Sequence, residues 1–292
     1  MALTKNGKDM EYIVNKSFDN ERALYESNGV CLEGCTFQGE ADGESALKES
    51  QNIVANNCLF DLRYPFWHDN NVEINGCKMT EKCRAPLWYS NGIKINASEL
   101  HGTKALRECC NIEIKACHIV SSELGWDSYG FKLFDTYAQG EYMLSRARQI
   151  EARDFKMTGK YSFQYIEDAV FENCVLDTKD AFWHAKNVTV KNSTVKGEYL
   201  GWYSENLTLE NCVITGTQPL CYCKNLRLIN CQMYECDLAF EKSTVEAEIT
   251  TPVISIKNVL SGKITVPRVD EIICDGERYK GVIEMQNAEC KM

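Results

Sequence analysis

Three nine-residue stretches spaced 19 residues apart decide the fold: NVTVKNSTV at residues 187–195, NLTLENCVI at 206–214 and NLRLINCQM at 225–233. Each begins with asparagine, alternates apolar and polar residues, and passes through a second asparagine to a serine or cysteine. Alternation with a period of two is typical of a strand with one buried face. Asparagine tolerates left-handed backbone and satisfies turn amides, so each stretch predicts a strand bounded by turns.

The same pattern recurs along most of the chain. One position of the repeat, called position zero, holds Cys35, Cys58, Cys77, Ser98, Cys117, Thr136, Phe155, Cys174, Ser193, Cys212 and Cys231. Its occupants are separated by 23, 19 and 21 residues and then seven times by 19. A further apolar position, eleven residues before position zero, predicts a second strand and holds Leu24, Leu47, Phe66, Leu87, Leu106, Leu144, Phe163, Phe182 and Leu220. A unit this short cannot bury its apolar face alone, but stacked units make one continuous core.

We therefore predict an all-β fold, a single-stranded right-handed parallel β-helix (a solenoid) of about eleven or more coils of mostly 19 residues. The hand does not follow from periodicity. Right-handed is favoured because the hexapeptide repeat usual in left-handed helices is not visible. No linker-like stretch interrupts the chain, so residues 1–292 are predicted to form one domain. Within it we expect an N-terminal cap at 1–29, regular coils at 30–243, and irregular last coils with a C-terminal cap at 244–292.

The amino-acid composition restricts the kinds of partner and the cellular compartment that are expected. The formal net charge of −10 argues against sequence-independent binding of nucleic acid, which needs clustered Lys and Arg. No run of about eighteen apolar residues occurs, so no membrane span is expected. The first ten residues lack the apolar region and cleavage site of a signal peptide. The 16 cysteines are therefore interpreted as reduced thiols of a cytoplasmic protein.

All five tryptophans fall at one repeat position, ten residues before the next position zero. Because the same position accepts Lys48 and Arg107, we expect it to point outward, and coils spaced at about 4.8 Å would align it and the next position into two stripes. The lengthened coils place loops at residues 39–44 and 80–84, which could wall a binding face. The candidate ligand-binding residues are Lys48, Glu49, Trp67, His68, Trp88, Tyr89, Arg107, Glu108, Trp126 and Asp127.

Exposed aromatics flanked by charges suit a carbohydrate or another extended polar ligand, by ring stacking and hydrogen bonds. Two other interpretations stay open: an aromatic ladder that stabilises the coils, and a non-enzymatic scaffold whose flat faces bind a partner protein or a second copy. Enzymatic activity is undecided. In a catalytic interpretation Glu49, Glu108 and Asp127 are candidate acids or bases. Lys48 and Arg107 would stabilise negative charge. Hydrolysis would need two carboxylates about 5–9.5 Å apart, which Glu108 and Asp127 on adjacent coils could provide.

No cofactor and no metal site are predicted. The position-zero cysteines share the side of the core valines and leucines, so they are interpreted as small apolar filling. Neither a histidine cluster nor a pair of CxxC motifs accompanies them. A Ser/His/Asp order, a phosphate loop and a G-x-S-x-G elbow are also missing from the sequence.

The strings at residues 44–50 (ESALKES), 63–68 (RYPFWH) and 200–204 (LGWYS) resemble a bacterial family catalogued only as a domain of unknown function (number three-seven-three-seven), which is placed near the pectin-lyase-like β-helices. The resemblance spans nearly the whole chain. It implies a right-handed β-helix and no particular activity. The paired aspartates with Gly-His-Gly and the Arg-x-Pro-x-x-Arg string of pectin-lyase-like enzymes do not occur here, which argues against polysaccharide cleavage by their mechanisms.

Overall fold

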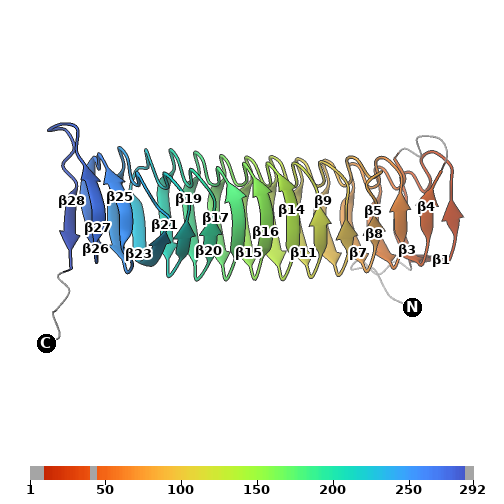
Figure 1. The fold of residues 1–292 in the computed structure, drawn as a ribbon. Coiled ribbons are helices and arrows are strands. Elements are labelled where there is room, and N and C mark those ends of the chain that lie inside the picture. The colour runs from red at the N-terminus through yellow and green to blue at the C-terminus, as the bar shows by residue number, and fades with distance from the viewer. Residues whose placement is uncertain (1–9, 40–44, 287–292) are drawn as a thin grey trace, which may run out of the picture. The chain divides into compact units, whose positions relative to one another are not determined.

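Two compact units make up the chain, Met1–Gln149 and Ile150–Met292. The computed structural model describes residues 10–39 and 45–286. Within each unit short strands are stacked coil upon coil, and the described residues contain no helix (Figure 1). The predicted parallel β-solenoid with coils of about 19 residues is confirmed, while the single-domain organisation stays a prediction.

In unit 1 every coil contributes a longer and a shorter strand. The longer strands are β1 (Glu11–Val14), β3 (Asn28–Glu33), β5 (Gln51–Asn56), β7 (Asn70–Asn75), β9 (Asn91–Asn96), β11 (Cys110–Lys115) and β13 (Tyr129–Phe134). The shorter strands are β2 (Ser17–Phe18), β4 (Thr36–Gln38), β6 (Leu59–Asp61), β8 (Lys78–Met79), β10 (Glu99–Leu100), β12 (His118–Val120) and β14 (Tyr137–Glu141). Each strand pairs in parallel with its equivalent on the next coil, and Ile53 lies opposite Val30 and Val72 as the repeat predicts. Because β1 pairs with β3, placing Glu11 opposite Val30, the coils begin inside the segment predicted as a cap.

Unit 2 is built from the same kind of paired strands. It contains β16 (Lys156–Lys160), β17 (Glu167–Glu172), β18 (Val175–Lys179), β19 (Lys186–Lys191), β20 (Thr194–Lys196), β21 (Glu205–Glu210), β22 (Val213–Thr215), β23 (Leu226–Tyr234), β24 (Thr244–Ile249), β25 (Val253–Lys257), β26 (Ser261–Val266), β27 (Val269–Ile273) and β28 (Val282–Met285), and β15 (Arg148–Arg153) contains the junction of the units. The single strand β23 pairs with both β21 and β22. Parallel pairing of β24, β26 and β28 extends the stack through the tail that the sequence predicts as irregular.

Stacked side chains fill the interior of each coil. Phe18, Phe37 and Phe60 form a column with ring centroids 4.7 and 5.0 Å apart and planes within 11°. Ile114 in unit 1 and Leu209 in unit 2 occupy the predicted inward columns and are buried. Burial of such aliphatic and aromatic columns is the main source of stability that a solenoid has.

Asparagine side chains form a second kind of column at the turns. Asn71 donates a hydrogen bond from Nδ2 to Oδ1 of Asn52 at 2.7 Å in unit 1. In unit 2, Asn225 bonds Asn206 and Asn206 bonds Asn187 in the same way, at 2.7 and 2.8 Å. Asn52 and Asn206 have φ of 56° and 55°, in the left-handed region that asparagine tolerates. The asparagine columns are therefore turn chemistry, as predicted.

Besides its two strands, each coil has a turn segment around the apolar position that lies eleven residues before position zero. The sequence predicts a strand there. Leu47 and Phe66 are buried as expected, but each has φ of 59°, and Glu49 repeats that value two residues later. Left-handed residues alternating in this way are incompatible with a strand. Backbone hydrogen bonds still join the coils, because the Leu47 amide donates to the carbonyl of Ala23 at 2.9 Å and the Glu49 amide to that of Trp67 at 2.8 Å. The strand prediction is wrong because burial with a period of two does not reveal the sign of φ.

Position-zero cysteines are expected to resist thiol reagents in the native protein. All seven are free and buried. Burial raises the pKa of Cys35, Cys117 and Cys174, the last to about 11, so little of these thiols is reactive thiolate at pH 8. Hydrogen bonding to a neighbouring cysteine lowers the pKa of Cys77 and Cys231, and these two are protected by burial, which keeps the reagent out. Exposed Cys110 and Cys274 should react quickly under the same conditions. Maleimide labelling followed by peptide mass spectrometry checks this. Rapid labelling at position zero without denaturant, or a disulfide between two of these residues, would contradict it.

Candidate binding face

The turn segments carry the predicted site residues to the outside of unit 1. In the five coils that carry these residues, a buried residue such as Leu87 precedes a half-buried one, Trp88, which is followed by an exposed one, Tyr89. The half-buried inner row contains Lys48, Trp67, Trp88, Arg107 and Trp126, and the exposed outer row contains Glu49, His68, Tyr89, Glu108 and Asp127. All ten side chains therefore lie on one outward side of unit 1.

The inner row is packed against itself. The rings of Trp67 and Trp88 lie 5.4 Å apart at 57°. The Arg107 guanidinium lies 5.4 Å from the Trp88 ring and 5.7 Å from the Trp126 ring, so it is held between two indoles by cation–π contact. Trp88 also donates from Nε1 to the carbonyl of Lys104. These contacts explain how a charged residue fits a tryptophan column whose indoles are half-buried.

The outer row combines one ring pair with carboxylates that are already paired. His68 stacks on Tyr89 with centroids 4.9 Å apart and planes within 16°. The carboxylates contact neighbouring cations, Glu49 with Lys48 at 3.6 Å, Glu108 with Arg107 at 3.4 Å and Asp127 with Arg148 at 3.7 Å. Glu108 and Asp127, the predicted candidate pair, are thus each engaged with a different arginine. Such exposed ion pairs contribute at most about 1 kcal/mol each.

One of the two loops predicted to wall this face can be described. Within the segment 80–84, Thr80 Oγ1 and Lys82 Nζ both bond the Asp61 carboxylate, at 2.6 and 2.7 Å. The hydrogen bond from Lys82 holds the pKa of Asp61 below its usual range. These bonds fix the loop to the end of β6. Residues 40–44 of the other predicted loop lie outside the described residues.

Unit 2 contains a longer row of stacked rings at the same repeat positions. Tyr165, His184, Tyr203 and Tyr222 follow one another with centroids 4.9, 5.0 and 4.8 Å apart and planes within 5°, 8° and 12°. Burial between the tyrosines lowers the pKa of His184. Sequence analysis confined the candidate site to the N-terminal half. The signal for this row was present, since four successive coils place an aromatic ring nine residues before position zero.

An inner row supports these rings as in unit 1. The indoles of Trp183 and Trp202 are parallel within 5° at 5.3 Å, and their Nε1 atoms donate to the carbonyls of Tyr199 and Gln218 at 2.7 and 2.8 Å. Gln164 makes the equivalent bond to the carbonyl of Asp180 at 3.2 Å. This bond across the turn explains why glutamine can replace tryptophan in the column.

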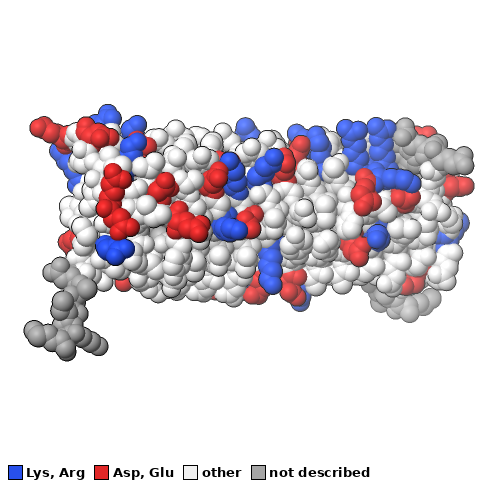
Figure 2. Space-filling view, in the orientation of Figure 1, with Lys and Arg blue, Asp and Glu red and all other residues white. Residues whose placement is uncertain are grey.

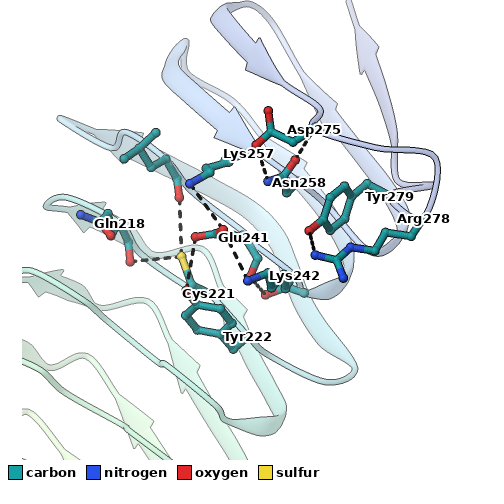
Figure 3. Close-up of polar contacts among 12 residues, drawn as sticks. Gln218, Cys221, Tyr222, Glu241, Lys242, Lys257, Asn258, Asp275, Arg278 and Tyr279 are labelled. Carbon is teal, nitrogen blue, oxygen red and sulfur yellow. Dashed lines mark hydrogen bonds and ion pairs between the residues drawn. The ribbon is translucent and has the colours of Figure 1, made fainter.

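A polar cluster follows the ring row of unit 2 (Figure 3). Tyr222 donates from its hydroxyl to Oε2 of Glu241 at 3.3 Å, while Oε1 of Glu241 contacts Lys257 at 3.4 Å and Lys242 at 3.9 Å. Burial and the nearby Glu241 carboxylate raise the pKa of Tyr222 to about 12, so this hydroxyl remains a hydrogen-bond donor at neutral pH. The neighbouring Cys221 thiol is buried and contacts the carbonyl of Gln218 at 3.5 Å. The row therefore leads into a group of hydroxyl, carboxylate and ammonium functions.

Outside these rows, basic and acidic side chains lie close to one another. Figure 2 shows basic and acidic side chains beside one another on the visible face, separated by areas without charge. Ion pairs between adjacent coils, such as Lys179 with Glu198 at 2.7 Å and Lys191 with Glu210 at 3.4 Å, account for part of this pattern. Among the described residues there is no helix long and apolar enough to cross a membrane.

Comparison with known proteins yields one family match. The model of the family described as "Protein of unknown function (DUF3737)" matches residues 11–286. No curated protein matches the chain. The A-module of the mannuronan C-5 epimerase AlgE4 from Azotobacter vinelandii is similar in structure at 10% identity, with 96% of this chain and 90% of that chain covered and a TM-score of 0.30. The surface adhesin PfbA of Streptococcus pneumoniae is similar at 10% identity, with 86% and 74% covered and a TM-score of 0.39. Likenesses this distant carry no argument about function.

Proposed function

We propose that this chain, which belongs to the DUF3737 family of proteins of unknown function, binds an extended polar polymer of the carbohydrate class along the ring rows of its coils. The observation that carries the proposal is the stack of Tyr165, His184, Tyr203 and Tyr222 in unit 2. Tyr165 and Tyr203 remain 45% and 48% exposed even though their ring faces touch their neighbours. What they offer to solvent is a line of ring edges and hydroxyl groups.

A regular line of donors and apolar edges suits a regular polymer. The rings repeat at about one coil spacing, 4.8–5.0 Å between centroids, which is close to the length of one pyranose residue in an extended glycan. Tyrosine hydroxyls and the imidazole can hydrogen-bond sugar hydroxyls, and the ring edges can contact sugar C–H groups. Glu241 and Lys242 extend the polar line beyond Tyr222 (Figure 3).

The corresponding face of unit 1 is proposed as a second contact surface. It comprises the predicted residues Lys48, Glu49, Trp67, His68, Trp88, Tyr89, Arg107, Glu108, Trp126 and Asp127. Here the exposed ring pair is His68 with Tyr89, flanked by carboxylates rather than by further rings. Its contribution to binding should therefore be smaller than that of the row in unit 2.

A non-enzymatic scaffold that binds another protein or a second copy is the alternative. It is favoured because side chains of the inner rows already have partners within the protein. Arg107 is held between two indoles, and Trp183 and Trp202 donate hydrogen bonds to turn carbonyls. A scaffold face would still use the exposed tyrosine edges, but it would not retain glycans. The sedimentation of the intact protein at increasing concentration, measured beside glycan binding, separates the two functions.

Replacing Tyr203 with alanine is expected to weaken glycan binding about tenfold or more, because it removes one of the two inner rings of the row together with its hydroxyl. A glycan array probed with the intact protein identifies the ligand, and titration of the strongest glycan compares the variants. Tyr234→Ala is the matched control, since Tyr234 is 47% exposed but lies on β23 outside the row.

Thermal unfolding of both variants accompanies the titrations. Loss of one stacking interaction on each side should destabilise Tyr203→Ala by no more than about 1–3 kcal/mol. Equal binding by wild-type protein and Tyr203→Ala, or equal loss in Tyr234→Ala, would contradict the proposal, and an array without any retained glycan would favour the scaffold.

A further inference from the structure

Two histidines of unit 1 face each other on adjacent coils, away from the rows described above. His101 directly follows β10 and His118 begins β12, the strand that pairs with β10 in parallel. Nε2 of His101 lies 3.4 Å from Nδ1 of His118, with the ring planes at 70°. Ring N–H hydrogen bonds usually span 2.7–3.2 Å, so this contact is long for one.

Neighbouring side chains contact both rings. Nδ1 of His101 faces Oε1 of Glu81 at 3.6 Å. A carboxylate on that side favours the tautomer that carries its proton on Nδ1, which leaves the Nε2 lone pair directed at His118. His118 stacks on Tyr137 with centroids 5.2 Å apart and planes within 15°, which fixes its ring from the other side. Metal-binding histidines typically have this support, a carboxylate on the ring nitrogen that does not bind the metal.

The separation of the two nitrogens suits a shared metal ion. Two imidazole nitrogens at about 2.0–2.1 Å from a tetrahedral zinc ion lie about 3.3–3.4 Å apart, and the distance here is 3.4 Å. Glu99 lies opposite His118 on the paired strand, and its carboxylate contacts Lys78 at 3.1 Å. The described residues contain no group of three His, Cys, Asp or Glu side chains that could hold a metal, so water would complete the coordination.

We propose that His101 and His118 form a two-histidine site for a divalent transition-metal ion of the Zn²⁺ and Cu²⁺ class, with Glu81 as the residue that positions His101. The site is independent of glycan binding. Imidazole nitrogen is a preferred ligand of these ions, and affinity should increase from Zn²⁺ to Cu²⁺ in the usual order for such ligands.

The test is calorimetric titration with Zn²⁺, in the intact protein carrying Cys110→Ser and Cys274→Ser so that exposed thiols do not bind the ion. We expect one zinc ion per chain. His101→Gln and His118→Gln should each lower the affinity at least tenfold, and Glu81→Gln should lower it by a smaller factor. His68→Gln is the matched control for metal binding, since His68 is exposed and ring-stacked like His118 but has no second imidazole beside it.

A rise in melting temperature with added Zn²⁺ should accompany binding in the parent protein and disappear in the two histidine variants. Circular dichroism of each variant before metal addition verifies that it is folded. The proposal is overturned if His101→Gln and His118→Gln bind Zn²⁺ as tightly as the parent, if His68→Gln weakens binding as much as they do, or if the parent protein binds none.

Discussion

Replacing Asp69 with asparagine is expected to stabilise the protein by about 4 kcal/mol at pH 7 while changing its stability little at pH 4. The Asp69 side chain is fully buried in unit 1, and burial raises the pKa of its carboxyl to about 8. Oδ1 accepts a hydrogen bond from the Ser50 amide at 2.7 Å, but Oδ2 has no partner among the described residues. Ionising this group inside the coil is therefore unfavourable.

The direction of the pH dependence follows from the protons bound in each state. The unfolded chain releases the Asp69 proton near pH 4, whereas the folded protein holds it until about pH 8. The contribution of this group to the free energy of unfolding is complete below pH 4. It is lost as the pH rises from about 4 to about 8, by about 1.4 kcal/mol per pH unit. Asparagine has no proton to release, so the advantage of the variant grows with pH.

Urea unfolding of wild-type protein and Asp69→Asn between pH 4 and 8 measures the effect. Asp69→Ser should show the same trend, because the equivalent positions of neighbouring coils hold Ser50 and Ser90, whose hydroxyls accept the same backbone bond. Asp135→Asn, at an exposed turn of the same unit, is the control. A stability difference that stays constant across the pH range would contradict the assignment.

Truncating Ile114 or Leu209 to alanine is expected to destabilise the protein by about 2–5 kcal/mol, since each removes a fully packed side chain from an inward column and leaves a cavity. Lys94→Ala and Thr208→Ala, on the outward side of equivalent strands, should change stability by less than about 0.5 kcal/mol. Urea unfolding compares each pair within its own unit. Equal effects of an inward and an outward substitution would contradict the assigned register.

Strand register was predictable because apolar residues recur with little variation. Val30, Ile53 and Val72 occupy one repeat position and lie opposite one another in adjacent strands. The turn segment was not predictable in the same way. Leu47 and Phe66 show the burial pattern of a strand, but their positive φ values depend on hydrogen bonds between coils that the local sequence does not reveal.

The sequence indicated that the candidate residues point outward, but not how their side chains pack. Lys48 and Arg107 in a tryptophan column indicated an outward position, and the structure has both residues and their neighbouring tryptophans half-buried. That Arg107 lies between two indoles depends on side-chain packing, which spacing alone does not define. The contact between His101 and His118 was not predictable from the repeat. The two residues are 17 positions apart instead of 19, so they do not occupy the same repeat position, and they meet only because adjacent coils stack.

Hydroxyl-radical footprinting with the glycan selected by the array tests the proposed binding face most directly. In the free protein the exposed rings of Tyr165, Tyr203 and Tyr234 should be modified at similar rates. Saturating glycan should protect Tyr165 and Tyr203, together with His184 between them, and leave Tyr234 unchanged. Protection of Tyr234 with no protection of Tyr165 and Tyr203 would place the ligand elsewhere and contradict the proposed function.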